Sequence, residues 1–156
     1  MQTLTSTKKQ QLQKVADELI HLLADTYTLY LKTQNFHWNV TGPHFASLHV
    51  LFEEQYKELA DATDIIAERI RALGCHAPAS FAEFSKLSSL KEAPTSDVAA
   101  KDMLKQLLRD HEIIIKQLSH MIEKAEKAHD EGTLDLLTER IRVHEKTAWM
   151  LRSSID

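Results

Sequence analysis

Residues 35–70 read NFHWNVTGPHFASLHVLFEEQYKELADATDIIAERI, and this stretch decides the fold. Gly42-Pro43 separates two long runs of helix-forming residues, and proline is favoured in the first turn of a helix. The stretch therefore predicts a hairpin of two antiparallel helices, the first ending before Gly42 and the second beginning near Pro43.

The hairpin is expected to place two histidines side by side. His37 lies five residues before Gly42, and His49 lies seven residues after it. At a rise of about 1.5 Å per residue, these offsets correspond to about 8 and 10 Å from the turn. An antiparallel hairpin therefore brings the two imidazoles to the same level.

Acidic residues follow the second histidine at helical spacing. His49 and Glu53 are four residues apart, as are Asp64 and Glu68, so each pair shares one face of the helix. Imidazole and carboxylate ligands together suit iron, manganese or zinc. Fifteen residues separate His49 from Asp64, which is about 22 Å along the helix axis and about 60° around it. Because the ligands of one metal ion must converge, the two pairs cannot meet within one chain.

A second copy of the chain removes this obstacle. If the same helix of a second subunit lies antiparallel across a two-fold axis near residues 56–58, each site combines residues of both subunits, and two-fold dimers are the commonest oligomers. One subunit then supplies His37, His49 and Glu53, and its neighbour supplies Asp64 and Glu68. The alternative is that the three carboxylates are solvated helix-face charges and that His49 is a tolerated polar residue.

The same residues resemble those of the Dps family, the mini-ferritins. The likeness lies in His37-Trp38, Gly42, Leu48-His49 and Glu53, then in Asp64, Ala67-Glu68-Arg69 and Leu73-Gly74, and in the run HEKTAWMLR at residues 144–152. It covers nearly the whole chain and implies a ferritin-like four-helix subunit, a hollow dodecameric shell built from two-fold dimers, and ferroxidase sites at the two-fold interfaces. It also implies that the five residues of the shared site bind iron. Many members have aspartate in place of Glu53, and the longer side chain would alter metal spacing or affinity.

The function implied by the resemblance is iron storage and detoxification. Fe(II) is oxidised at the shared sites, preferably with hydrogen peroxide, and ferric mineral is stored in the shell. Iron is the expected metal, with zinc or manganese as the alternative, and the preference for peroxide rests on the resemblance alone. Trp38 beside His37 is then a candidate electron donor that absorbs a stray oxidising equivalent.

A third acidic group lies near the start of the last expected helix. Glu131, Asp135 and Glu139 recur every four residues. Acidic residues in a first turn are explained equally well by the helix dipole. The resemblance implies instead acidic three-fold pores through which ferrous iron enters, with Asp135 as the strongest candidate.

Composition predicts a single all-α domain over residues 1–156, with residues 1–7 as a flexible tail. Only three Gly and three Pro occur, with 43% hydrophobic and 27% charged residues, which favours long helices. We expect a cytoplasmic protein, with nucleoid association as a further option: no apolar run reaches the ~20 residues of a membrane span, the N-terminus lacks the apolar core of a signal peptide, and Cys75 is alone.

The expected architecture is a ferritin-like four-helix bundle with a long connection between the second and third long helices. A short helix in SFAEFSKLS, capped by Ser80, is expected to cross the middle of the second helix and to pad the dimer contact. Phe81 and Phe84 are expected to hold it in place. The long helices are expected at residues 7–39, 43–73, from 95–97 to about 128, and 132–154.

Binding to DNA is expected to be weak or absent. The net charge is −4, whereas DNA affinity arises mainly from neutralised phosphates. Lys8 and Lys9 are the basic residues nearest the N-terminus and would give at most salt-sensitive avidity over a shell. A nucleoid-compacting protein that protects DNA by association is the competing function.

Other histidines are expected not to bind metal. Glu18-x-x-His21 and Glu126-x-x-His129 have the spacing of a di-iron site inside a bundle. Glu18 and His21 lie off the apolar stripe of their helix, however, His129 lies at a helix end, and the stripes lack the two further inward carboxylates that such a site needs. His111 lies on an apolar face and is expected to be a hydrogen-bonded core histidine.

Overall fold

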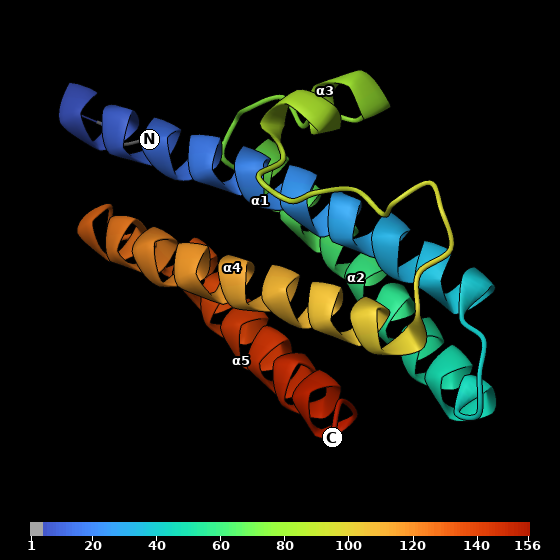
Figure 1. Cartoon of the computed structure of the whole chain (residues 1–156). Coiled ribbons are helices and arrows are strands. Elements are labelled where there is room, and N and C mark those ends of the chain that lie inside the picture. Colours follow the sequence, from blue (N-terminus) through green and yellow to red (C-terminus); the bar gives the residue numbers. More distant parts are fainter. Residues whose placement is uncertain (1–4) are drawn as a thin grey trace.

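The computed structural model describes residues 5–156, which contain five helices and no strand. Four long helices form a bundle, and the short helix α3 lies in the connection between the second and third of them (Figure 1). The predicted all-α four-helix bundle with a helix in its long crossover is confirmed. The helices are α1 (Ser6–Asn39), α2 (Phe45–Ala72), α3 (Phe81–Leu87), α4 (Ala100–Lys127) and α5 (Glu131–Ser153).

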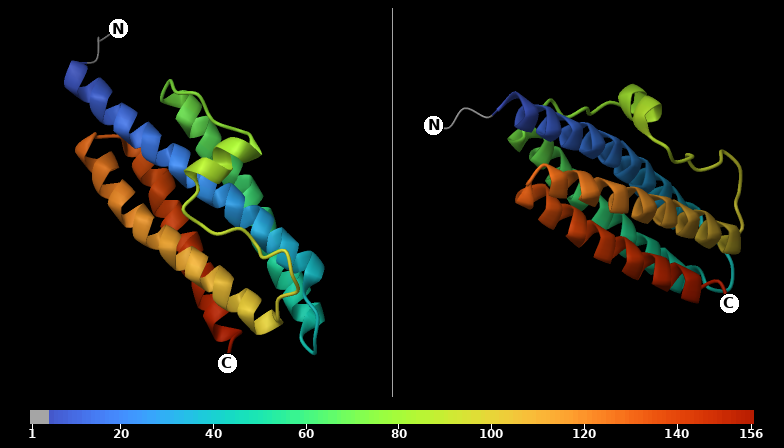
Figure 2. Two further views of the ribbon diagram at one scale, coloured as in Figure 1. Left: turned by 45° about the horizontal axis from the view of Figure 1, so that its top comes forward. Right: turned by 90° about the vertical axis from the view of Figure 1, so that its left-hand side faces the viewer.

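The bundle consists of two hairpins, α1 with α2 and α4 with α5 (Figure 2). The segment from α3 to α4 runs back along the bundle, so α2 and α4 point in the same direction (Figures 1 and 2). A bundle with one long crossover differs in this way from an up-down-up-down bundle, in which each helix reverses the direction of the one before. The arrangement leaves the α1–α2 hairpin, which carries the predicted site, with an outer face that α4 and α5 do not cover.

The first helix begins one residue earlier than predicted. Thr5 is its N-cap, with the hydroxyl oxygen accepting a hydrogen bond from the Lys8 amide at 3.4 Å. Of the predicted flexible tail, residues 1–4 lie outside the described residues, while Ser6 and Thr7 belong to α1.

Two other helix starts were predicted too early. Gly42 has a φ of +112°, a backbone conformation that suits glycine, and its carbonyl accepts from the Phe45 amide at 3.1 Å. Pro43 therefore lies in the turn, and α2 begins at Phe45. The α4 helix begins at Ala100 rather than at residues 95–97, because the backbone at Ala99 is still extended, with ψ 144°.

The short helix α3 is capped by Ser80 as predicted, with the hydroxyl accepting from the Glu83 amide at 3.2 Å. It does not cross α2, however. Phe84 stacks on Tyr27 of α1 with ring centroids 4.8 Å apart, so α3 packs against α1. Only Phe84 is buried, whereas Phe81 is 74% exposed and does not hold the helix in place as predicted.

The core is a continuous apolar stripe along all four long helices. On α2, the predicted core positions Leu48, Phe52, Leu59, Ile66 and Ile70 are all buried. Truncating one such Phe, Leu or Ile to alanine typically lowers the free energy of unfolding by about 2–5 kcal/mol. None of the helices in the described part of the chain combines the length and apolar character needed to cross a membrane.

Candidate metal centre

The helical hairpin brings His37 and His49 together as predicted. Their rings are stacked, with centroids 3.8 Å apart and planes 13° apart. Each ring also bonds the backbone of the other helix: Nδ1 of His37 lies 2.6 Å from the His49 carbonyl, and Nδ1 of His49 lies 2.7 Å from the His37 carbonyl. His37 is in the last turn of α1, where carbonyl groups lack helical partners, and His49 supplies one.

The two hydrogen bonds fix the protonation pattern of the rings. A carbonyl oxygen only accepts, so Nδ1 of each neutral ring must carry the hydrogen. The lone pair of each ring then resides on Nε2, which is the arrangement of a histidine prepared to bind a metal. The pair therefore offers two Nε2 atoms as possible metal ligands, and hydrogen bonds to the backbones of α1 and α2 hold both rings in place.

Two aromatic side chains enclose the pair. Phe45 stacks on His49 at a centroid distance of 5.0 Å, and Tyr56 meets His37 edge-on at 5.2 Å. His37 is buried, with 7% of its surface exposed, whereas His49 is half-buried. The rings are thus restrained by packing as well as by hydrogen bonds.

Glu53 lies one turn after His49 but binds a different partner. Its Oε1 accepts from Lys57 Nζ at 3.0 Å. The Lys57 ammonium holds the pKa of Glu53 below its usual value, with smaller contributions in the same direction from His37 and His49. Glu53 is therefore ionised and close to the imidazoles, but it is paired with lysine.

Asp64 and Glu68 are exposed on α2 and lie away from the histidine pair. Within residues 5–156, no group of three or more His, Cys, Asp or Glu side chains is placed to hold a metal ion. Asp64 lines a hollow of about 420 Å³ between α1, α2 and α3, together with Tyr27, Phe81 and Phe84. The structure brings together the histidines, and Glu53 near them, and leaves Asp64 and Glu68 at a second location.

Arg69, the neighbour of Glu68, connects the part of α2 that carries Asp64 and Glu68 to α5. Its guanidinium donates to Asp130 Oδ1 at 2.5 Å and to Thr133 Oγ1 at 3.0 Å. Asp130 is also the N-cap of α5, accepting from the Thr133 amide. The end of α2 that carries Glu68 is therefore tied to the start of α5.

The three acidic residues of the predicted pore all lie on the exposed side of α5. Glu131 occupies its first turn, Asp135 is exposed, and Glu139 pairs with Arg142. Among residues 5–156, Asp135 takes part in none of the ion pairs within the subunit. Their role in a pore stays a prediction, because it depends on neighbouring subunits.

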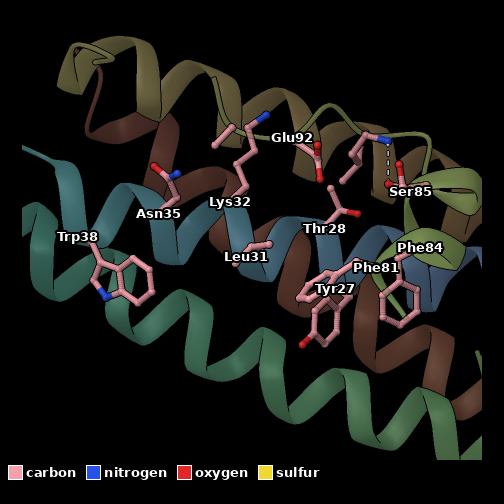
Figure 3. A pocket seen from close by; sticks show the side chains of 13 residues that line it. Tyr27, Thr28, Leu31, Lys32, Asn35, Trp38, Phe81, Phe84, Ser85 and Glu92 are labelled. Atoms are coloured by element: carbon pink, nitrogen blue, oxygen red, sulfur yellow. Dashed lines mark hydrogen bonds between the residues drawn. The ribbon is translucent and has the colours of Figure 1, made fainter. Parts of the chain in front are cut away.

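Trp38 occupies the surface of the single subunit, beside a hollow. It is 64% exposed and lines a hollow of about 490 Å³ on the outer face of α1, which also includes Leu31, Asn35 and Phe81 (Figure 3). It forms no ring contact with His37 or His49 among the described aromatic pairs. Its role as electron donor stays a prediction.

The remaining candidate histidines occupy other environments. His21 is exposed and bonds the Leu87 carbonyl through Nδ1 at 3.1 Å, and His129 is exposed in the turn before α5. His111 is buried and hydrogen-bonded as predicted, with its Nδ1 2.8 Å from Nδ1 of His144. Sequence reasoning did not identify His144 as its partner.

Sequence reasoning also missed Tyr56 and Lys57, which contact the predicted ligands directly. A signal for Lys57 was present, since it follows Glu53 by four residues on the same helix face. Tyr56 gives no such signal, because its contact with His37 joins two helices and depends on the packing of α1 against α2.

Comparisons with known proteins agree with this fold. The model of the ferritin-like domain matches residues 16–156. A low temperature-induced protein of Nostoc sp. is 43% identical over 94% of this chain and 83% of its own length. The DNA protection during starvation protein 2 of Bacillus anthracis is 39% identical over 92% of this chain and 98% of its own length.

Solved structures agree as well. The crystal structure of a Dps protein from Vibrio cholerae, described as a member of a superfamily of ferritin-like diiron-carboxylate proteins, is 34% identical with a TM-score of 0.91, covering 95% of this chain and 92% of that one. With a ferritin-like match over most of its length and close relatives among the DNA protection during starvation proteins, the chain belongs to the Dps family of ferritin-like proteins.

Proposed function

We propose that this protein oxidises and stores iron at sites shared between two subunits. The observation that carries the proposal is the His37–His49 pair, whose carbonyl hydrogen bonds leave two Nε2 atoms available as metal ligands, whereas residues 5–156 of one chain hold no complete group of three metal ligands. Asp64 and Glu68 of a neighbouring subunit would complete the site. Membership of a family that includes a ferritin-like diiron-carboxylate protein supports iron as the metal.

Exposed apolar side chains support a two-fold dimer. Trp38, Phe45 and Val50 flank the histidine pair, while Ile65 and Phe81 flank Asp64, and all are 44–74% exposed in the single chain. An antiparallel two-fold axis would place each group of apolar residues over the other, burying both. We propose that such dimers assemble into a hollow shell, the dodecamer expected of the family.

The imidazole and carboxylate ligands have different roles in the proposed oxidation of iron. The imidazoles hold iron without adding charge, and the carboxylates stabilise Fe(III) over Fe(II). Glu53 joins them by exchanging Lys57 for the metal. Fe(II) is the substrate, hydrogen peroxide is the proposed oxidant, and ferric product collects as mineral in the cavity. The same ligand set admits zinc or manganese.

Entry of iron is assigned to the acidic residues of α5. Three copies of Asp135, with Glu131 and Glu139, would attract cations around a three-fold axis. Association with DNA is proposed to be weak, because the chain carries a net charge of −4, although relatives are named for DNA protection.

Stopped-flow oxidation of Fe(II) with peroxide and with dioxygen tests the site. We expect His49→Ala and Asp64→Ala each to lower the initial rate at least tenfold, since each removes a ligand. Glu54→Ala, an exposed carboxylate beside Glu53, is the matched control and should keep the wild-type rate. Wild-type rates in both site variants would refute the proposal.

Mixing the two inactive variants tests whether the site is shared. A dimer with one His49→Ala chain and one Asp64→Ala chain has both lesions in one site and leaves the other intact. Co-refolded mixtures should therefore regain activity that neither variant has alone. No recovery in mixtures shown to contain mixed dimers would mean that each site lies within one subunit.

A further inference from the structure

All three tyrosines of the chain, Tyr27 and Tyr30 of α1 and Tyr56 of α2, belong to one row of neighbouring aromatic rings. Tyr56 lies 6.0 Å from Tyr30, and Tyr30 lies 5.4 Å from Tyr27, measured between ring centroids. Each spacing is within the 4.5–7 Å range of interacting aromatic pairs. The tyrosines of this chain are therefore not scattered but form one continuous series.

The two ends of the row meet the two parts of the proposed site. Tyr56 contacts the His37 ring edge-on at 5.2 Å. At the other end, Tyr27 and Asp64 line the same hollow. The row thus leads from the histidines of a subunit to the carboxylate region of the same subunit.

These two ends belong to different iron sites if the proposed two-fold dimer is correct. The histidines of one chain serve the first site, and its Asp64 serves the second, about 22 Å away along α2. Direct electron transfer over such a distance is slow, because tunnelling weakens exponentially with distance. Transfer in short steps between oxidisable rings is much faster.

We propose that Tyr56, Tyr30 and Tyr27 form an electron relay that joins the two iron sites of a dimer. The inference rests on the proposed function. Hydrogen peroxide accepts two electrons, whereas one Fe(II) supplies only one. The relay provides the second electron when a site holds a single iron, and it thereby prevents release of a hydroxyl radical.

The electrons and atoms of the step balance. The O–O bond of peroxide breaks with one electron from Fe(II) and one from the Tyr56 phenol, whose proton joins one oxygen. The products are Fe(III), hydroxide, water and a tyrosyl radical. An electron from Fe(II) at the second site then returns through Tyr27 and Tyr30, and with a proton from water it restores the phenol. In total, two Fe(II) reduce one peroxide.

Trp38 is the competing donor, and the structure favours the tyrosines over it. Its exposed ring lies along α1 from Tyr27 and Phe84, on the outer face (Figure 3). Tyr56, by contrast, touches an imidazole of the proposed site. Tyrosine-to-phenylalanine variants keep the ring and its packing while removing the easily oxidised phenol.

Freeze-quench electron paramagnetic resonance after peroxide addition tests the relay. With one Fe(II) per dimer, the wild type should form a tyrosyl radical, and with two it should form several-fold less, because the second iron reduces the radical. Tyr56→Phe should abolish the signal and increase spin-trapped hydroxyl radical several-fold. Tyr30→Phe should keep a radical at Tyr56 that the second iron no longer quenches.

Trp38→Phe and Trp149→Phe are the controls, and neither should change the radical. Loss of the radical in Trp38→Phe, or no tyrosyl radical in a wild type that oxidises iron normally, would overturn the relay while leaving the iron site intact. If His49→Ala and Asp64→Ala also oxidise iron normally, the proposed function and the relay both fail. The two failures are thus distinguished by the ligand variants.

Discussion

At the scale of single residues, Lys57 pairs with Glu53, one of the proposed metal ligands. The ammonium lies 3.0 Å from Glu53 Oε1 and lowers the pKa of that carboxyl group. Both side chains are solvent-exposed, so the ion pair contributes little to folding stability. The ion pair would instead affect metal binding, because a cation must displace Lys57 before Glu53 can become a ligand.

Lys57→Met is therefore expected to strengthen binding of Fe(II) several-fold, because it frees Glu53 and removes a nearby positive charge. Anaerobic calorimetry with Fe(II) measures the affinity, and the gain should shrink as salt screens the charge. Lys101→Met, an exposed substitution on α4, is the control and should leave binding unchanged. Unchanged affinity in Lys57→Met would show that Glu53 does not take part in binding.

The sequence predicts the histidine pair well and its surroundings poorly. Counting residues on either side of Gly42 shows that His37 and His49 lie at similar distances from the turn, because helices rise by a fixed amount per residue. The carbonyl hydrogen bonds and the contact of Tyr56 depend on how closely α1 and α2 approach. Sequence spacing does not contain that distance.

At the scale of helices, a directed hydrogen-bond chain joins α2, α5 and α4. Arg140 donates to both oxygens of Glu58 at 2.7 and 2.8 Å and approaches His144 Nε2 at 3.1 Å. Arginine only donates, so His144 accepts at Nε2 and must donate from Nδ1 to His111. Both buried histidines are therefore neutral.

These histidines should make the protein sensitive to acid. Burial lowers the pKa of His111 from 6.5 to about 3, with a further contribution from Arg140, and burial also lowers the pKa of His144. Below pH 6.5 the unfolded chain binds protons that the folded chain does not. The stabilisation is therefore complete above pH 6.5 and is lost progressively as the pH falls toward 3.

Denaturant unfolding between pH 7.5 and 5 measures this effect. His111→Gln keeps an acceptor for His144 but does not titrate, so it should reduce the dependence of unfolding free energy on pH by up to about 1.4 kcal/mol per pH unit. His120→Gln, an exposed histidine on α4, is the control and should keep the wild-type slope. An unaltered slope in His111→Gln would mean that His111 titrates normally.

The presence of each helix is predictable from the periodicity of apolar residues. The residues at which the helices begin, and the helix against which α3 packs, are less predictable. The Ser80 cap follows from a local pattern of serine followed by glutamate three residues later. The choice of α1 over α2 as the partner of α3 depends on the stacking of Phe84 on Tyr27, which are far apart in the sequence.

At the scale of the whole molecule, the apolar side chains around the two half-sites form the proposed subunit contact. Phe81 is 74% exposed and Ile65 is 56% exposed, although both are large and apolar. A charge placed there would have to be buried without a partner on association, which is strongly unfavourable.

Ile65→Glu and Phe81→Glu are expected to dissociate the dimer at micromolar concentrations, with loss of Fe(II) oxidation. Sedimentation velocity measures the subunit number, and circular dichroism checks that the helices persist. Trp149→Glu introduces the same charge at an exposed ring of α5, away from both half-sites, and should keep the two-fold dimer. Intact dimers in both α2–α3 variants would place the subunit contact on another face.

The crossed bonds between each imidazole and the opposite backbone carbonyl have a consequence for the proposed storage of iron. They join the end of α1 to the start of α2 through the protein's own groups, so this contact does not depend on a bound cation. In the proposed shell, iron would then bind and leave without a change in the shape of the subunit.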